Sequence, residues 1–305
     1  MAIKKLVAIE PKVLTAIVFM LLGAAFIPVG DSIAKYLSNA TDYSAIQLAW
    51  VRFSIGACLL LPIAAARVSF KKLDSTFMFR QSVRGVLIAL TVSSIIQAVS
   101  LSPIAEVFGV FFIGPILSVI LSVVVLKESA SVAEWFSVVL GFVGVLLVVQ
   151  PDFFGFFDSG STANEVVKRT GLYWALLAGV FYGCFLVATR WAAGGGPPLA
   201  QVSLQFLVAA IVLTPFAVLS FFDNGIQSLH WLIIMSITSL LANYFSILAL
   251  ARAPASTLAP VVYFQVVAAT IIGLSVFGET LGLVAALGLS IIVISGFFRL
   301  SPQAK

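Results

Sequence analysis

Long apolar runs, separated by short polar connections, dominate the chain. A helix needs about 17–25 mostly apolar residues to cross a bilayer core about 30 Å thick. Ten such runs occur, at residues 13–37, 45–66, 83–101, 103–126, 132–149, 171–193, 200–222, 229–250, 254–277 and 281–298. These runs do not alternate between apolar and polar positions, as membrane-spanning strands would. The pattern therefore predicts an all-α integral membrane protein of ten transmembrane helices.

Composition supports a membrane environment and leaves little room for another domain. Hydrophobic residues make up 61% of the chain and charged residues only 10%, whereas soluble proteins average roughly 45–50% and about 25%. The two longest connections, 67–82 and 151–170, are too short for a soluble domain or a separate catalytic module. We therefore expect the lipid bilayer to be the main surrounding of the protein.

The positive charges predict an orientation. Lys and Arg concentrate in cytoplasmic loops of membrane proteins. With the N-terminus inside, only Lys168 and Arg169 fall outside, and Lys35 and Arg52 fall in or near the bilayer. The cytoplasmic side then carries Lys4, Lys5, Lys12, Arg67, Lys71, Lys72, Arg80, Arg84, Lys127, Arg190, Arg252, Arg299 and Lys305. We expect both termini in the cytoplasm of a bacterium, and the net charge of +5 needs no nucleic-acid partner to explain it.

Metal and cofactor chemistry find little support in the sequence. Cys58, Cys184 and His230 are scattered through apolar runs, whereas a structural zinc site takes four Cys or His ligands. The glycines at 194–196 are not followed by the Lys-Ser/Thr of a phosphate-binding loop. We therefore expect no metal, no cofactor and no ATP-driven step within this chain.

An internal repeat relates the two halves of the chain. Pro103 and Pro254 each lie 25 residues before a glutamate, Glu128 or Glu279, that closes an apolar run. Further matches, with offsets of 151 to 155, pair Ala98 with Ala249, Pro62 with Pro215, Phe26 with Phe181 and Lys35 with Arg190. A unit of five spans reverses direction when repeated, so the two units are inverted, as is usual in secondary carriers. The predicted organisation is a first repeat at 1–150, an external linker at 151–170 and a second repeat at 171–305.

Short motifs in a fixed order along nearly the whole chain resemble those of a known family. They are GDSIAK at 30–35, WVRF at 50–53, SPIAE at 102–106, GP at 114–115, LKE at 126–128, GFVGV at 141–145, APAS at 253–256 and FGE at 277–279. On these motifs the chain resembles the drug/metabolite transporter superfamily, in particular its EamA-type ten-helix members. Within that superfamily, the first helix and the SPIAE segment are most similar to a bacterial subgroup that includes riboflavin and S-adenosylmethionine uptake carriers.

The resemblance implies a function and an architecture. It implies a secondary transporter that moves a small organic metabolite across the cytoplasmic membrane by alternating access, with spans 1, 3, 4, 6, 8 and 9 around a central cavity. The second repeat departs from the pattern at Val266, where the first has Pro115, and has Gln205 in place of Arg52. The substrate class within the subgroup, whether riboflavin-like or S-adenosylmethionine-like, stays open.

Charged residues inside spans are costly and normally pair or face water. Asp31 and Lys35 are four residues apart on one helix face, so they can form an ion pair. They are either a self-neutralising structural pair, or a substrate contact or coupling switch. Arg52 is expected to pair with a carboxylate or to cap helix-end carbonyls, and its role is either structural or one of coupling or gating. Glu106, at the start of the fourth span, is likewise expected to have either a structural role or a role in coupling or gating.

Aromatic and amide side chains supply a candidate substrate cavity. Phe108, Phe112 and Pro115 share one helix face, and Pro115 also predicts a kink because proline removes a helical hydrogen bond. Such residues can hold a flat or amphipathic solute by stacking and a few hydrogen bonds, or they can simply fill the gaps between helices. The further candidates are Gln97, Tyr182, Asn243, Tyr244, Tyr263 and Gln265.

Several residues are assigned structural roles. Glu128 and Glu279 lie in matching turns, and Ser131 with Glu134 reads as a capping box for the following helix. Gly179 and Gly183 form a small-residue face suited to close helix packing.

Other functions remain as alternatives. The chain could be an exporter of amino acids or other metabolites, or a non-transporting membrane receptor or channel. An intramembrane enzyme would need a facing catalytic pair, whereas Asp31 and His230 both lie near the edges of spans, so we expect no enzyme. Ten helices suffice for one pathway, which leaves a monomer or a homodimer open.

Overall fold

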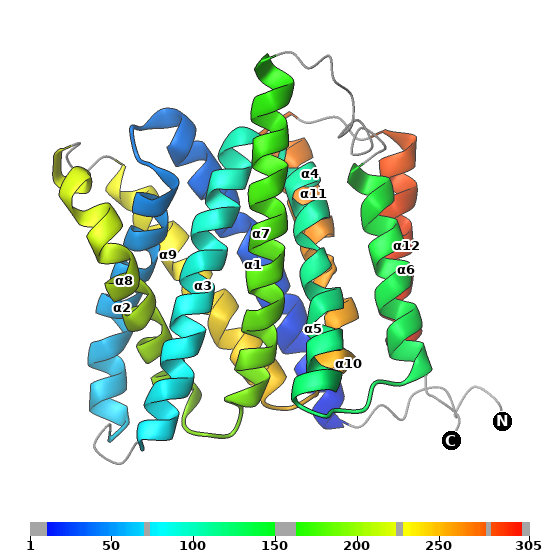
Figure 1. Ribbon diagram of the computed structural model, residues 1–305, viewed down its shortest axis with the longest axis horizontal. Helices are drawn as coiled ribbons and strands as arrows, with labels where there is room; N and C mark the ends of the chain where they lie inside the picture. The colour runs from blue at the N-terminus through cyan, green and yellow to red at the C-terminus, as the bar shows by residue number, and fades with distance from the viewer. Residues whose placement is uncertain (1–10, 70–73, 150–162, 224–227, 279–281, 301–305) are drawn as a thin grey trace.

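The computed structural model describes residues 11–69, 74–149, 163–223, 228–278 and 282–300, and every regular element among them is a helix. The helices are α1 (Pro11–Ala40), α2 (Ala45–Arg67), α3 (Ser75–Leu101), α4 (Ile104–Phe111), α5 (Ile113–Val125), α6 (Val132–Val149), α7 (Ala163–Trp191), α8 (Pro198–Asp223), α9 (Leu229–Leu250), α10 (Ala255–Val262), α11 (Phe264–Val276) and α12 (Leu283–Leu300). They stand roughly side by side in one bundle (Figure 1).

Eight of the described helical stretches are long and apolar enough to cross a membrane. In that count α4 and α5 act as one span, as do α10 and α11. Large apolar side chains such as Val124, Phe216 and Leu287 point outward, while many polar ones are buried inside. This inside-out distribution suits a lipid solvent, and it confirms the predicted all-helical, multi-pass membrane protein.

Two helices begin earlier than the apolar runs predicted. The third span starts at Ser75 instead of residue 83, and the Asp74 side chain caps it by accepting a hydrogen bond from the Phe77 amide at 2.9 Å. The sixth span starts at Ala163 instead of residue 171, so part of the expected linker is helical, and α7 rises above its neighbours in Figure 1. The first turns of both helices contain charged residues, so they fall outside the apolar runs from which the spans were predicted.

A helix is broken in each half of the chain, at positions that match in the sequence. The break between α4 and α5 falls at Phe112, whose amide donates to the carbonyls of Phe108 and Gly109. This confirms the kink predicted from Pro115, which has no amide hydrogen to offer the preceding turn. The break between α10 and α11 falls at the matching Tyr263, although Val266 replaces the proline there. The second half instead has Pro260 inside α10, three residues before its break, whereas Pro115 lies three residues after the break at Phe112.

The helices pack in pairs that join the first half of the chain to the second. α1 lies along α9 and α3 along α7, while α2 lies along α8 and α6 along α12. The last two pairs form opposite ends of the bundle in Figure 1. The interior between these ends is one continuous core of apolar side chains drawn from both halves.

Small residues allow two helices in this core to approach each other closely. A Cβ atom on Gly183 would lie 2.7 Å from the carbonyl oxygen of Gly114, and one on Gly114 would lie 2.7 Å from that of Gly179. The backbones of α5 and α7 therefore touch, as the small-residue face of α7 predicted. This contact holds the α4–α5 break against α7.

We expect Gly179→Leu to destabilise the folded protein, because a Cβ at this position already meets the Phe111 carbonyl oxygen at 2.5 Å. Overpacking of this kind costs about 1–3 kcal/mol or more. The measurement is the fraction of monodisperse protein that survives a heating series in detergent. Val180→Leu, on the exposed side of the same helix, is the matched control. Equal survival of the two variants would contradict the close contact.

Candidate functional site

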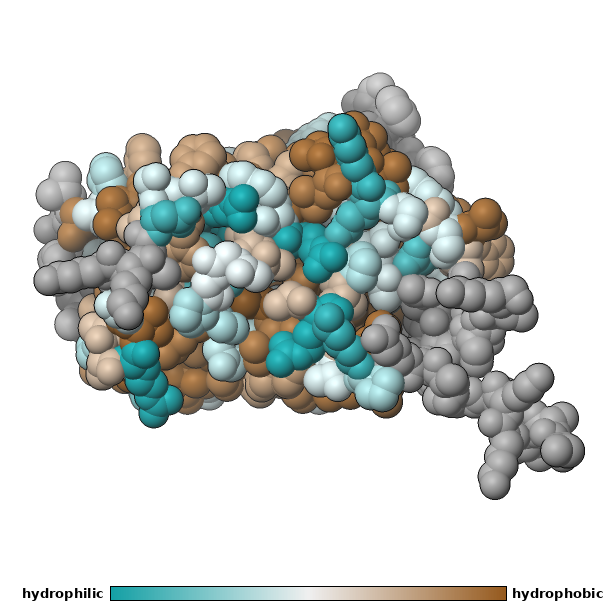
Figure 2. Space-filling view, turned by 90° about the horizontal axis from the view of Figure 1, so that it is seen from below, coloured by the Kyte–Doolittle hydropathy of each residue, from teal (hydrophilic) through white to brown (hydrophobic). Residues whose placement is uncertain are grey.

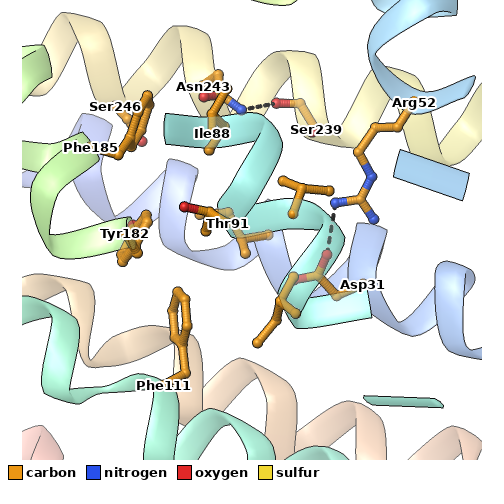
Figure 3. Close-up of a pocket in the computed structure, with 13 residues that line it drawn as sticks. Asp31, Arg52, Ile88, Thr91, Phe111, Tyr182, Phe185, Ser239, Asn243 and Ser246 are labelled. Carbon is orange, nitrogen blue, oxygen red and sulfur yellow. Dashed lines mark hydrogen bonds and ion pairs between the residues drawn. The ribbon is translucent and has the colours of Figure 1, made fainter. Parts of the chain in front are cut away.

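A pocket lies inside the bundle, and its empty space of about 520 Å³ includes the open solvent at its mouth. Its wall draws on α1, α2, α3, α4, α7 and α9, and so on both halves of the chain. The lining residues are Ile27, Asp31, Arg52, Ile88, Thr91, Val92, Ile95, Phe111, Tyr182, Phe185, Ser239, Asn243 and Ser246 (Figure 3). A mainly apolar wall with a few polar groups is the usual character of a small-molecule site.

An ion pair closes one end of this cavity. Arg52 Nη1 lies 2.8 Å from Asp31 Oδ1, and Arg52 Nη2 donates to the Gly30 carbonyl at 2.9 Å. Both side chains are almost completely buried. Arg52 therefore pairs with a carboxylate, as expected, whereas its second bond goes to a carbonyl in the middle of α1 and not to a helix end. The close pairing gives the cavity a polar end without a net charge.

Lys35 is not the partner of Asp31, contrary to the pairing that their spacing predicted. Its Nζ donates to the Ser102 carbonyl at 3.3 Å and lies 5.3 Å from the centre of the Phe277 ring. Helical spacing places Lys35 on the same face as Asp31. Arg52, however, reaches the carboxylate from the facing helix with a geometry that Lys35, one turn further along α1, does not match.

Aromatic rings form a second part of the wall. The Tyr182 ring lies 4.8 Å from that of Phe111 and 6.3 Å from that of Phe185, centre to centre. The Tyr182 hydroxyl accepts a hydrogen bond from Gln265 Nε2 at 3.0 Å, which ties α11 to the wall from behind. Stacked rings of this kind present flat apolar faces with one polar edge, which suits a planar solute.

Hydroxyl and amide groups complete the wall. Thr91 and Ser246 donate their hydroxyl hydrogens to carbonyls of their own helices, at 2.8 and 2.9 Å. Asn243 donates to the Ser239 carbonyl at 2.9 Å, as Figure 3 shows, and accepts from Gln205 Nε2 at 2.8 Å. The Asn243 amide is thus held in one orientation from both ends. These groups fix the hydrogen-bonding pattern that a solute would meet.

Other sequence candidates lie behind the wall. Phe108, Phe112, Pro115, Tyr263 and Gln265 are buried but do not line the cavity, and Gln97 and Tyr244 are half-buried elsewhere. The Phe112 ring packs against the Tyr263 ring at 5.3 Å, and the Tyr263 hydroxyl donates to the Val138 carbonyl at 3.1 Å. In the conformation described, these aromatic residues fill the space between the broken helices and α6.

Of the four acidic residues predicted near helix ends, the structure describes the side-chain contacts of two. Glu128 pairs with Arg190, whose Nε lies 2.6 Å from Glu128 Oε1. The capping box is confirmed, since Ser131 N donates to Glu134 Oε2 at 2.7 Å and Glu134 N donates to Ser131 Oγ at 3.3 Å. The Glu106 side chain and the whole of Glu279 lie outside the described residues.

Sequence reasoning missed much of the lining. Phe111, Phe185, Thr91, Ser239 and Ser246 carry no charge or unusual spacing that sets them apart from neighbouring residues. A face-by-face reading of α3 could have found Thr91, because Ile88, Thr91 and Ile95 follow helical spacing. No pattern in the sequence says which face of a span looks inward when both faces are apolar.

A multi-pass helical bundle with a central cavity drawn from both halves is typical of membrane transporters. The chain belongs to the EamA-like transporter family, whose model matches residues 14–150 and again residues 169–300. This membership agrees with the resemblance found in the sequence and with the expectation that the protein is a transporter and not an enzyme.

The curated relatives are distant but match along most of their length. An S-adenosylmethionine uptake transporter of Rickettsia prowazekii is 22% identical over 87% of this chain and 85% of that protein. One from Rickettsia conorii is 25% identical, also over 87% of this chain and 85% of that protein. An uncharacterized transporter of Helicobacter pylori is 28% identical over 62% of each. A solved crystal structure shares the fold, with a TM-score of 0.69 at 18% identity over 94% of this chain and 95% of its own.

We expect Asp31→Asn or Arg52→Gln alone to cost about 3–5 kcal/mol, because each leaves a buried charge without its partner. The double variant should recover much of this loss, since it leaves no charge to compensate. Apparent melting temperatures in detergent, combined as a double-mutant cycle, measure the coupling. Arg67→Gln, which removes an exposed arginine from α2, should change little. Additive losses would show that the pair is not coupled.

Proposed function

We propose that this chain is a secondary transporter that moves a small organic metabolite, of the S-adenosylmethionine or riboflavin type, across the bacterial cytoplasmic membrane by alternating access. The observation that carries the proposal is the cavity, whose wall combines helices from both halves of a chain in a transporter family. A solute held there touches both halves at once, so a rocking movement of one against the other can change the side to which the site opens.

The proposal includes ten spans in two inverted five-helix repeats, at 1–150 and 171–305. α6 and α12, each of 18 residues, supply the two spans beyond the eight longer ones. The packing pairs support an inverted symmetry, since exchanging the halves turns the α1–α9 contact into the α7–α3 contact and leaves α2–α8 and α6–α12 unchanged. The breaks at Phe112 and Tyr263 and the two matches to the family model support the same repeat.

The distribution of charge supports cytoplasmic termini. Figure 2 views the end of the bundle that carries the connections after α2, α5, α7 and α9, and hydrophilic side chains are scattered across it between hydrophobic flanks. Basic residues of the described chain at this end include Lys12, Arg67, Arg80, Lys127, Arg190 and Arg252, against Lys168 and Arg169 at the other. The positive-inside rule assigns the richer end to the cytoplasm.

The chemistry of the wall suits an amphipathic solute with a flat ring. Tyr182, Phe111 and Phe185 offer ring faces, and Asn243 with neighbouring hydroxyls offers fixed hydrogen bonds. The Asp31–Arg52 pair offers both a carboxylate and a guanidinium, so it can exchange part of its own contact for contacts with a solute. Two of the relatives are S-adenosylmethionine uptake transporters, which supports import as the direction and that compound as the first to test.

Cysteine labelling tests the orientation. In a Cys58→Ala, Cys184→Ala background, Lys168→Cys should react with a membrane-impermeant maleimide in spheroplasts. Arg67→Cys should react only after the membrane is opened, because it lies at the basic end. The reverse labelling pattern would contradict the proposed topology.

Uptake into proteoliposomes tests the transport activity. We expect time-dependent accumulation of labelled S-adenosylmethionine that riboflavin and amino acids do not abolish. Thr91→Phe should lower the initial rate at least tenfold, because the added ring would occupy the cavity that Thr91 lines.

The matched control is Val86→Phe on the same helix, which faces outward and should keep the wild-type rate. Folding is checked for both variants by size-exclusion chromatography in detergent. Uptake of amino acids or riboflavin without S-adenosylmethionine would redirect the proposal to that substrate. An absence of transport of any of these compounds by folded protein would remove it.

A further inference from the structure

Arg84 is an arginine completely buried inside the bundle, outside the cavity lining. Its Nε donates to Thr189 Oγ1 at 3.1 Å, and Nη1 donates to Gln201 Oε1 at 3.3 Å. Nη1 also donates to Gln81 Oε1, and Nη2 donates to Gln205 Oε1. Four neutral oxygens from α3, α7 and α8 thus satisfy the guanidinium group.

The charge of Arg84 has no counter-ion among the residues that the structure describes. Every acceptor bonded to it is an amide or hydroxyl oxygen, whereas Arg52 has Asp31 and Arg190 has Glu128. Burying a charge without an opposite one is costly, so buried charges are normally paired. An arginine kept in this state is suited to bind an anion that arrives and leaves.

Arg84 lies one helical turn beyond the cavity on two helices at once. On α3 it precedes the lining residue Ile88 by four positions, and on α7 its partner Thr189 follows the lining residue Phe185 by four. The guanidinium also lies 5.8 Å from the centre of the Phe185 ring. In Figure 3, Phe185 lies at the opposite end of the cavity from the Asp31–Arg52 pair.

A chain of hydrogen bonds joins Arg84 to the cavity wall. Gln205 accepts from Arg84 through its oxygen and donates to Asn243 through its nitrogen, at 2.8 Å, and Asn243 lines the cavity. A carboxylate accepts stronger, charge-assisted hydrogen bonds from a guanidinium than an amide oxygen does. A solute carboxylate can therefore displace the Gln205 oxygen. Because Gln205 also donates to Asn243, this displacement changes the hydrogen bond of a residue that lines the cavity.

We propose that Arg84 is the residue that recognises a carboxylate on the transported solute, so that the carrier selects zwitterions of the amino-acid type over their decarboxylated amines. The inference deepens the proposed function and rests on it. The carboxylate reaches Arg84 when Gln205 and Phe185 turn aside. The remainder of the solute stays between the aromatic wall and the Asp31–Arg52 pair.

The test compares pairs of compounds that differ by one carboxylate. The pairs are S-adenosylmethionine with its decarboxylated form, methionine with 3-(methylthio)propylamine, and arginine with agmatine. Binding to the purified full-length protein in nanodiscs is measured by calorimetry or by thermal shift. In any pair that binds, the carboxylate compound should bind at least tenfold more tightly to the wild type.

Two variants of the cluster should remove this preference by different routes. Arg84→Gln deletes the charge, and Gln205→Glu supplies an internal carboxylate that occupies the guanidinium group. Each should weaken binding of the carboxylate compound at least tenfold, and Arg84→Gln, which keeps the Gln205 side chain, should leave its decarboxylated partner within twofold. Arg84→Lys should keep part of the preference. Arg80→Gln, one turn away on α3, removes the same charge and should keep all of it.

The outcomes separate this inference from the proposed function. If the S-adenosylmethionine pair does not bind but another pair shows the Arg84-dependent preference, the proposed substrate is wrong and the inference stands. If the wild type binds both members of a pair equally, or if the preference survives in Arg84→Gln and Gln205→Glu, the inference is overturned. It is also overturned if no carboxylate compound in the panel binds the folded protein.

Discussion

A bilayer core offers no hydrogen-bonding partner, so every polar group inside the bundle must find one within the protein. For its most polar buried groups, the fold meets this constraint with contacts between helices that are far apart in the chain. Arg52 on α2 satisfies Asp31 and Gly30 on α1, and Tyr263 on the second half satisfies a carbonyl of α6. The same contacts that neutralise polarity therefore also decide which helices are neighbours. The cavity exists where apolar packing leaves a space between such contacts.

The two broken helices show how packing and local sequence share control of the backbone. Pro115 accounts for the break at Phe112, yet Tyr263 marks an equivalent break with no proline at the matching position. The rings of these two residues pack on each other, so each break faces the other across the bundle. A different proline, Pro260, lies inside α10 three residues before that break, so each bend has a proline close to it but on opposite sides. The two halves therefore share a broken helix at matching positions while differing in where their prolines lie.

Much of the fold could be predicted because the bilayer imposes a length and a polarity on each span. The kink at Pro115, the Ser131–Glu134 capping box and the pairing of Arg52 with a carboxylate followed from local rules. The site was harder, because the inward face of an apolar helix depends on its neighbours and not on its own sequence. Phe108 and Phe112 share a face with each other, but that face packs against protein, while Phe111 faces the cavity. Arg84 was counted with the cytoplasmic charges because its helix extends further than its apolar run.

The short pair α6 and α12 has a mechanical consequence for the surrounding lipid. Each has 18 residues, which reach about 27 Å at about 1.5 Å per residue, whereas α1 and α7 have 30 and 29 residues. A long helix can tilt to match the hydrocarbon thickness, but a short one cannot lengthen. If both helices span, a hydrocarbon core thicker than this has to thin, or flanking side chains have to reach outward, along the α6–α12 edge. The free energy of the protein in the membrane then depends on the bilayer thickness at that edge. Lipids of different chain length can therefore change the stability of the protein without contacting the cavity.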